Sequence, residues 1–274
     1  MTDDDVELQG TDFTKGLRHW RRIRKMTQLE LALAADVSQR HVSWLETGRS
    51  QPSRDMVVRL SEALNVPLRE RNQILNAAGF ANIYTESRLD EPSMASVHRV
   101  LSDILDHHDP YPAFVLDRCW NIQMLNKSAN WLFSLTGDPQ QMWADVVDCG
   151  EKNMALLTVH PHGLRKFITN WDLVIGPFMQ RLKREAIDTA DNALMERYQQ
   201  LEQFVEIPEL QTAETVLPML PLQIKLGEIE LSMCSVISAF GTTQDITARE
   251  LRIETFYPAD STSGDFLKSF QRAN

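Results

Sequence analysis

The sequence predicts a protein of two domains, an all-α domain of five short helices followed by an α+β domain. The chain has 274 residues, which is longer than most single domains. Apolar residues recur at helical spacing near the N-terminus, and further on they alternate with polar residues as in strands. Residues 13–83 contain 12 Lys and Arg but only 6 Asp and Glu, although the whole chain has a formal net charge of −10. A basic module joined to an acidic one is typical of proteins with a segment that binds nucleic acid.

Start and stop signals for successive helices fill the basic module. Apolar residues at helical spacing predict a first helix from Phe13. Thr27 and Glu30 have the spacing of a capping box, which predicts the start of a second helix. Ser38 is the predicted N-cap of a third helix, and Gly48 is the predicted left-handed residue that ends it.

Two further helices are predicted after Ser53 and Pro67. The stretch that follows them is polar and mixed in charge, as expected of a linker. The predicted domain boundaries are an acidic tail over 1–12, a basic helical domain over 13–81, a linker over 82–93 and an acidic α+β domain over 94–274.

Two capped helices joined by a short turn form a helix-turn-helix unit, whose second helix enters the major groove of DNA. The predicted recognition helix is 38–46, in which Val42 and Leu45 face the core. The polar residues between them suit base recognition, since Gln pairs with adenine and Arg with guanine. Gln28 and two later arginines are placed for phosphate contacts. The predicted DNA contacts are Thr27, Gln28, Ser38, Gln39, Arg40, Ser43, Trp44, Arg49 and Arg54.

An ordinary helical bundle coated with polar residues is the alternative interpretation of this module. The two N-caps, the capping box, the inward apolar set, the exit "ETGR" and the local positive charge together favour DNA binding. Residues 13–79 resemble the XRE-type repressor domain, in which positions matching Gln28, Gln39, Arg40 and Ser43 contact DNA. The chain departs from that pattern at Asp36, where glycine is common, and at Trp44, where a polar residue is common.

The second half of the chain predicts strands on both sides of a helical segment. The run "AFVLDRCWNIQMLN" predicts two short strands around a turn, and "KSANWLFSL" predicts a helix. Long helices are predicted over most of 164–205, with a kink or break at Gly176-Pro177. From Leu222 the apolar period falls to two, which predicts further strands, the last in "ELRIETFYP". An α+β domain with a helical insertion follows from this order.

Three motifs in this half resemble a known module. The runs "PAFVLDRCWNIQMLNKSANWLF", "HPHGLRKFITNW" and "FGTTQDITARELRIETFYPAD" are similar to the ligand-binding domain of MmyB-like transcription regulators. The resemblance implies a PAS-like sheet with a helical insertion and a largely apolar pocket. Fatty acids or related small molecules are the ligands that it implies, with an XRE-type domain ahead of the module.

The acidic half contains the aromatic residues that an apolar pocket needs, although core packing explains most of them equally well. An Arg with a nearby His can hold a carboxylate, which makes His160 and Arg165 candidates for a head-group site, against the alternative of a plain surface turn. The candidate ligand-binding residues are Phe114, Trp120, Met124, Asn126, Trp131, His160, Arg165, Trp171 and Phe178.

No metal or cofactor is expected. Two pairs of histidines, His107 with His108 and His160 with His162, have no third metal ligand at a useful spacing. Cys119, Cys149 and Cys234 are far apart and are expected to be core thiols. No apolar run approaches the length of a membrane-spanning helix, so a cytoplasmic protein without membrane contact is expected.

The combined pattern predicts a transcription regulator that binds double-stranded DNA as a homodimer and responds to a small apolar or fatty-acid-like ligand. The alternative is a DNA-binding protein whose acidic half binds another protein, such as RNA polymerase, without a ligand. An enzyme tethered to DNA is not expected, because the chain has no G-x-S-x-G, Walker or H-E-x-x-H motif.

Overall fold

A computed structural model of the chain describes residues 13–147, 152–206 and 219–273. The chain folds into two compact units. One unit extends to Glu86 and includes Gln244–Ile246, and the other comprises Ser87–Thr243 and the residues from Thr247 onward. Residues 82–86 of the predicted linker therefore belong to the first unit, while the predicted acidic tail over 1–12 lies outside the described residues.

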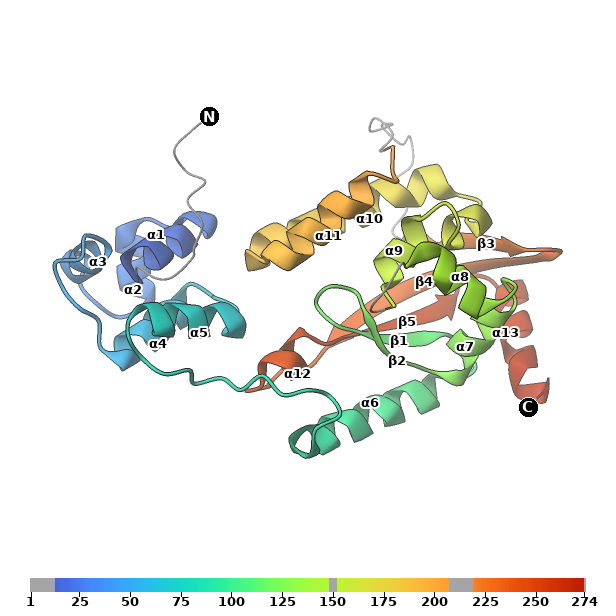
Figure 1. Cartoon of the computed structure of the whole chain (residues 1–274), viewed down its shortest axis with the longest axis horizontal. Coiled ribbons are helices and arrows are strands. Elements are labelled where there is room, and N and C mark those ends of the chain that lie inside the picture. The colour runs from blue at the N-terminus through green and yellow to red at the C-terminus, as the bar shows by residue number, and fades with distance from the viewer. Residues whose placement is uncertain (1–12, 148–151, 207–218, 274) are drawn as a thin grey trace. The chain divides into compact units, whose positions relative to one another are not determined.

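The first unit is helical, as predicted (Figure 1). Within residues 13–86 its helices are α1 (Phe13–Ile23), α2 (Gln28–Ala34), α3 (Gln39–Glu46), α4 (Arg54–Ala63) and α5 (Leu68–Ala77). They surround a core to which α1, α3 and α4 contribute residues such as Leu17, Trp20, Leu45 and Leu60, all almost fully buried. The five-helix prediction is confirmed.

The predicted caps form as the sequence indicated. The backbone N–H of Glu30 donates to Thr27 Oγ1 (3.2 Å), and Thr27 N–H donates back to the Glu30 carboxylate (2.7 Å), which completes the capping box. Ser38 Oγ accepts from the N–H of His41 (3.2 Å) at the start of α3. Asp36 takes a left-handed conformation with φ of 51°, which Asp tolerates better than most residues. The turn between α2 and α3 therefore forms without the common glycine.

A buried carboxylate ties α3 to the two helices before it. Glu46 is 2 % exposed and accepts two hydrogen bonds from Arg21 of α1, at 2.6 and 2.9 Å. Gln28 Nε2 of α2 donates to the same carboxylate (2.8 Å), and Arg18 donates to the backbone carbonyl of Glu46 (2.6 Å). Burial raises the pKa of Glu46, but the hydrogen bonds from Arg21 and Gln28 and the nearby positive charges outweigh burial and lower it overall. This network fixes the rotation of α3 about its axis.

The described part of the second unit contains an antiparallel five-stranded sheet in the order β2-β1-β5-β4-β3. The strands β1 and β5, which are the first and the last of these five in sequence, thus lie side by side in the middle of the sheet. The helical insertion separates β2 from β3 in sequence. This is the PAS-like α+β arrangement that the sequence predicted. The strands are β1 (Ala113–Leu116), β2 (Ile122–Leu125), β3 (Leu222–Leu226), β4 (Ile229–Ala239) and β5 (Arg252–Pro258).

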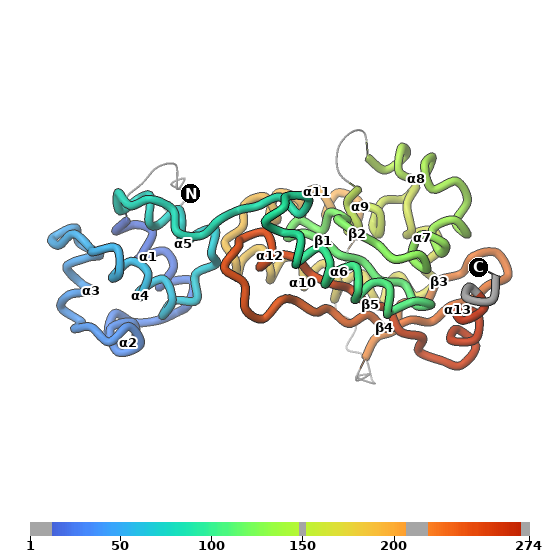
Figure 2. The backbone as a smooth tube through the Cα atoms, turned by 90° about the horizontal axis from the view of Figure 1, so that it is seen from below, coloured from blue at the N-terminus to red at the C-terminus, as the bar shows by residue number. Residues whose placement is uncertain are grey.

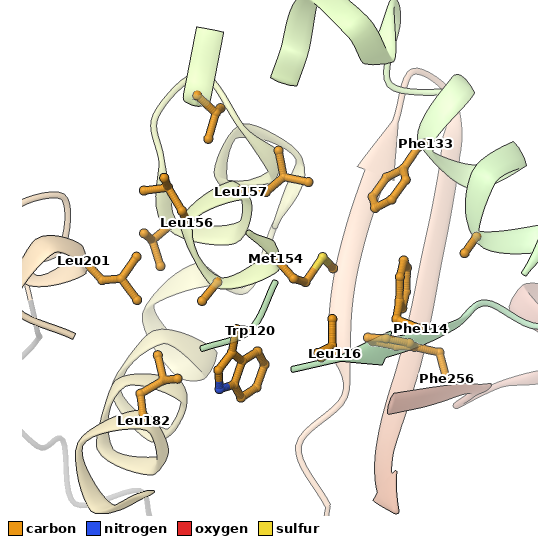
Figure 3. Packing of buried hydrophobic residues seen from close by; sticks show 14 of the residues in the cluster. Phe114, Leu116, Trp120, Phe133, Met154, Leu156, Leu157, Leu182, Leu201 and Phe256 are labelled. Atoms are coloured by element: carbon orange, nitrogen blue, oxygen red, sulfur yellow. The ribbon is translucent and has the colours of Figure 1, made fainter. Parts of the chain in front are cut away.

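Helices cover both faces of this sheet, as Figures 1 and 2 show. Ala113 and Val115 of β1 pack with Leu101 and Leu105 of α6 (Ala95–His108) on one face. Alternate residues of β1 face the larger core (Figure 3), to which the helical insertion contributes. The inserted elements are α7 (Lys127–Ser134), α8 (Pro139–Val146), α9 (Met154–Val159), the short 3₁₀ helix η2 (Leu164–Phe167), α10 (Trp171–Thr189) and α11 (Asn192–Glu202). The remaining elements are η1 (Pro92–Met94), α12 (Ile246–Glu250) and α13 (Ser261–Ala273).

Gly176-Pro177 does not break the helix that contains it. α10 continues through Pro177 as one element, although proline cannot donate the usual backbone hydrogen bond. Ile175, Met179 and Leu182 are fully buried on its inner face, and this packing holds the helix together. The helix α10 therefore borders the sheet as one uninterrupted element.

Two of the three cysteines differ from their predicted core environment. Cys119 and Cys234 are free thiols and only half-buried, because Cys119 lies in the turn between β1 and β2 and Cys234 lies on the less covered face of β4. Cys149 lies outside the described residues. Among the helices that the structure describes, none is long and apolar enough to cross a membrane.

Replacing Glu46 with alanine tests the network that holds α3. The change leaves the largely buried Arg21 without its carboxylate, and we expect it to destabilise the first unit by about 3 to 5 kcal/mol. Hydrogen exchange of the α1 and α3 amides in the full chain measures this loss. Glu62→Ala is the matched control, since that carboxylate is 59 % exposed and 3.6 Å from Arg71, and surface pairs contribute at most about 1 kcal/mol. Equal effects of the two changes would contradict the anchoring role of Glu46.

Candidate functional site

The outward face of α3 carries the predicted base-contacting residues. Gln39 and Arg40 are exposed, and Ser43 and Trp44 are half-exposed. Val42 and Leu45 face inward and are fully buried. The helix thus separates an apolar side that packs on its own unit from a polar side that is free to meet a partner. Such a helix matches the dimensions of the DNA major groove, which is about 12 Å wide.

Arg40 is held against an aromatic ring on this face. Its guanidinium carbon lies 4.4 Å from the centroid of the Trp44 ring, within the range of cation–π interactions. The two residues are one helical turn apart, which places their side chains next to each other. The exposed cation of α3 therefore has a preferred orientation.

The remaining predicted DNA contacts lie at helix starts and loops around α3. The Thr27 hydroxyl and the Gln28 amide are both engaged within the unit, Thr27 with Glu30 and Gln28 with Glu46. Their side chains position α2, so a phosphate at this place would meet backbone N–H groups of the first turn. Ser38 likewise serves as an N-cap, whereas Arg49 and Arg54 are exposed.

The second unit contains a cavity of about 340 Å³ between the sheet and α10. Its size is at the lower end of the range for small-molecule sites. Most of its lining is apolar and aromatic, from the sheet, α7, α9, η2 and α10. Figure 3 labels some of these side chains within the core, among them Phe114, Phe133 and Phe256. Representative lining residues are Phe114, Trp120, Met154, Val174, Phe178 and Phe256.

Two charged residues interrupt this largely apolar lining, Arg181 of α10 and Glu254 of β5, and Ser235 of β4 lies beside them; Thr136 and Thr158 are the other hydroxyl residues of the lining. The Arg181 guanidinium lies over the ring of Trp120 at 4.5 Å, and its Nε and Nη2 atoms are buried without a hydrogen-bond partner. Burial lowers the pKa of Arg181, and burial raises the pKa of Glu254 although the positive charge of Arg181 opposes that shift. Buried guanidinium nitrogens without an acceptor at the wall of an apolar cavity could donate to a group that accepts hydrogen bonds.

A second arginine beside the cavity is fully paired. Arg252 of β5 donates to Glu185 of α10 at 2.7 Å, and the indole N–H of Trp120 points to the same carboxylate at 3.4 Å. The guanidinium of Arg252 lies 5.9 Å from the Trp120 ring. Trp120 therefore stands close to two arginines. Arg252 forms an ion pair with Glu185, whereas Arg181 forms no ion pair within the described residues, although the negative charge of Glu254 acts on it.

Four of the predicted ligand-binding residues line the cavity: Phe114, Trp120, Trp171 and Phe178. The other five lie outside its lining. Met124 packs with the α6 cluster on the opposite face of the sheet, and Trp131 stacks on Phe266. Asn126 is a buried cap that bonds the N–H groups of Ala113 and Ala129.

His160 and Arg165 also lie outside the lining of the cavity. Arg165 donates to the backbone carbonyl of Phe204 (2.7 Å) and stacks on Trp171 at 4.8 Å. His160 packs edge-on against Phe204. These two residues thus connect the segments around η2 and the end of α11, and Arg181 takes the place at the cavity that Arg165 was predicted to fill.

Arg181 and Glu254 are absent from the residues that the sequence predicts for this site. Both are charged residues on the inner face of their element: Arg181 lies one turn after Phe178, and Glu254 lies between the inward Arg252 and Phe256 of β5. The sequence signal that could have identified these two residues is a charged residue within an otherwise apolar stripe. Among the described residues, no three His, Cys, Asp or Glu side chains are grouped as metal ligands would be.

Comparison with known families gives matches over both units. Residues 97–269 match the model of the MmyB-like transcription regulator ligand binding domain. Residues 17–71 match a helix-turn-helix model. No curated protein gives a significant match to the chain.

Replacing Arg181 with methionine tests whether this cation serves the fold. Because Nε and Nη2 have no acceptor, and because Glu254 can take up a proton once the positive charge of Arg181 is removed, we expect Arg181→Met to cost the second unit less stability than Arg252→Met. Arg252→Met is the matched control, since it strands the Glu185 carboxylate at a cost of about 1 to 3 kcal/mol. Hydrogen exchange of the α10 and β5 amides in the full chain compares the two. A larger loss for Arg181→Met than for Arg252→Met would show that Arg181 is a structural residue.

Proposed function

Because the chain belongs to the MmyB-like transcription regulator ligand-binding domain family and has a helix-turn-helix region ahead of that domain, we propose that it regulates transcription by binding operator DNA in a sequence-specific way. In this proposal the chain binds as a dimer through α3 and responds to a small ligand in the cavity of the second unit. The observation that carries the proposal is the outward polar face of α3, set against its fully buried inner face.

The eight residues of α3 extend about 12 Å, and the major groove admits one such helix. Gln39 and Arg40 have the side chains that pair with adenine and guanine respectively. Arg49 and Arg54 are exposed cations near the recognition helix and supply phosphate contacts. The α3 face therefore combines sequence recognition with general attraction to the duplex.

A dimer places two recognition helices about 34 Å apart, one turn of DNA, so that each reads one half-site. The second unit biases the contact between protomers or their spacing when its cavity is filled. The proposal includes a cytoplasmic location, which is where a regulator of operator DNA acts. The proposal includes no catalytic step.

The ligand is a small amphiphile, an apolar or fatty-acid-like molecule with one polar end. The apolar lining supports the body of such a molecule, and the unpartnered N–H groups of Arg181 support a polar end that accepts hydrogen bonds. The energetic cost of keeping Arg181 without an acceptor favours a role in binding over a role in folding.

Selection of duplexes from a random pool with the full chain tests the DNA side of the proposal. We expect an inverted or near-inverted repeat with half-site centres about ten base pairs apart. Arg49→Ala is expected to weaken all duplexes about equally and to reduce the salt dependence by about one phosphate contact. Selection of a lone half-site would contradict the dimer, and the absence of any selected sequence would contradict operator recognition.

Filling the cavity with a larger side chain tests the proposed ligand binding. Val174 lines the cavity, whereas the neighbouring Leu173 is 57 % exposed and lies outside the lining. We expect the full chain to bind the fluorescent acid 11-(dansylamino)undecanoic acid, Val174→Trp to weaken that binding at least about tenfold, and Leu173→Trp to leave it unchanged. Both variants are compared by fluorescence titration.

Equal binding by both variants would place the probe outside the cavity.

Native mass spectrometry of the chain purified from cells distinguishes the alternative function. A chain that is consistently empty but carries a stoichiometric protein partner, such as RNA polymerase, would favour a protein-interaction module over a sensor.

A further inference from the structure

The pairing of Arg40 with Trp44 has a consequence for how α3 recognises bases. Arg40 is exposed and Trp44 is half-buried, so the ring offers a partly anchored surface to a long side chain. The distance of 4.4 Å from the guanidinium carbon to the ring centroid puts the cation over the ring, well within the range of cation–π contact. No ion pair of Arg40 with an acidic side chain occurs among the residues that the structure describes. The Trp44 ring is therefore the group that orients this cation.

A guanidinium that packs face-on against an aromatic ring keeps its edge free. The five N–H donors of arginine lie in the plane of the group and point outward from its edge. Guanine offers O6 and N7 side by side in the major groove, and arginine reaches both through two parallel N–H groups. An arginine stacked on tryptophan can therefore donate to guanine without giving up the stack.

A long side chain that is already oriented loses less rotamer freedom when it binds. Orientation also restricts the positions that the guanidinium can reach, so it raises discrimination between bases more than it raises affinity for the phosphate backbone. The stack covers one face of the Trp44 ring, which leaves only the other face and the edge for direct contact with DNA.

We infer that Trp44 determines specificity indirectly, as a positioning residue that orients Arg40 to recognise a guanine at one position of each half-site. The inference rests on the proposed function, because it requires that α3 lies in the major groove. It assigns the unusual tryptophan of this recognition helix a role in guanine selection.

Competition binding with the duplex selected by the full chain tests the inference. The measured quantity is the affinity ratio between that duplex and versions with each half-site base pair changed in turn. Arg40→Ala locates the position that Arg40 recognises, where we expect it to lower the preference for guanine at least about tenfold. Trp44→Leu removes the ring but keeps an apolar side chain, and it is expected to lower the same preference by about two- to fivefold. Trp44→Phe keeps an aromatic face and is expected to stay close to the wild type.

Three further observations separate positioning from a general structural role. Trp44→Leu should leave the preferences at other base positions and the salt dependence of binding unchanged. Adding Trp44→Leu to Arg40→Ala should cause no further loss of guanine preference, because the ring then has nothing to orient. Hydrogen exchange of the Val42 and Leu45 amides should match the wild type in both single Trp44 variants.

An unchanged guanine preference in Trp44→Leu would overturn the inference while leaving the proposed function intact. Uniform losses at every base position would also overturn it, since they indicate a role in folding or general affinity. If Arg40→Ala weakens all duplexes equally and reduces the salt dependence, Arg40 contacts phosphate and the inference is likewise wrong. A wild-type chain that selects no sequence would remove both the inference and the proposed function.

Discussion

The buried carboxylate of Glu46 is the interaction on which the DNA-binding face depends. It lies at the end of α3 and accepts hydrogen bonds from Arg21 of α1 and Gln28 of α2. Removing a charge from water is costly unless its hydrogen bonds are satisfied, and here they are. Because this carboxylate can point only inward, the rotation of α3 is fixed. Gln39 and Arg40 then face outward together.

Buried charges in the second unit are not all paired, unlike Glu46 in the first. Arg252 is paired with Glu185, but Arg181 keeps two buried nitrogen atoms, Nε and Nη2, without a hydrogen-bond acceptor beside an apolar cavity. A protein that needed only a stable core would gain by replacing such a residue with an apolar one. The contrast between the satisfied Glu46 and the unsatisfied Arg181 separates a charge that builds the fold from a charge whose hydrogen-bond donors the fold leaves unused.

Local signals made the first unit largely predictable from sequence. The N-caps at Thr27 and Ser38 depend on neighbours within three residues, and the structure forms both. The cavity depends on the pairing of α10 with β5, which brings Arg181 near Glu254 across more than seventy residues of chain. Sequence proximity pointed to His160 and Arg165 instead, whose contacts around Phe204 are themselves distant in sequence. Long-range packing decided which arginine meets the cavity.

Site-specific photocrosslinking of the full chain to its selected duplex tests the central claim most directly, namely that the outward face of α3 lies against base edges. The comparison places p-benzoylphenylalanine at Gln39, on that face, or at Glu62, an exposed residue of α4. The orientation set by Glu46 predicts crosslinks to the duplex from position 39 and none from position 62. Crosslinks from position 62 without any from position 39 would contradict it.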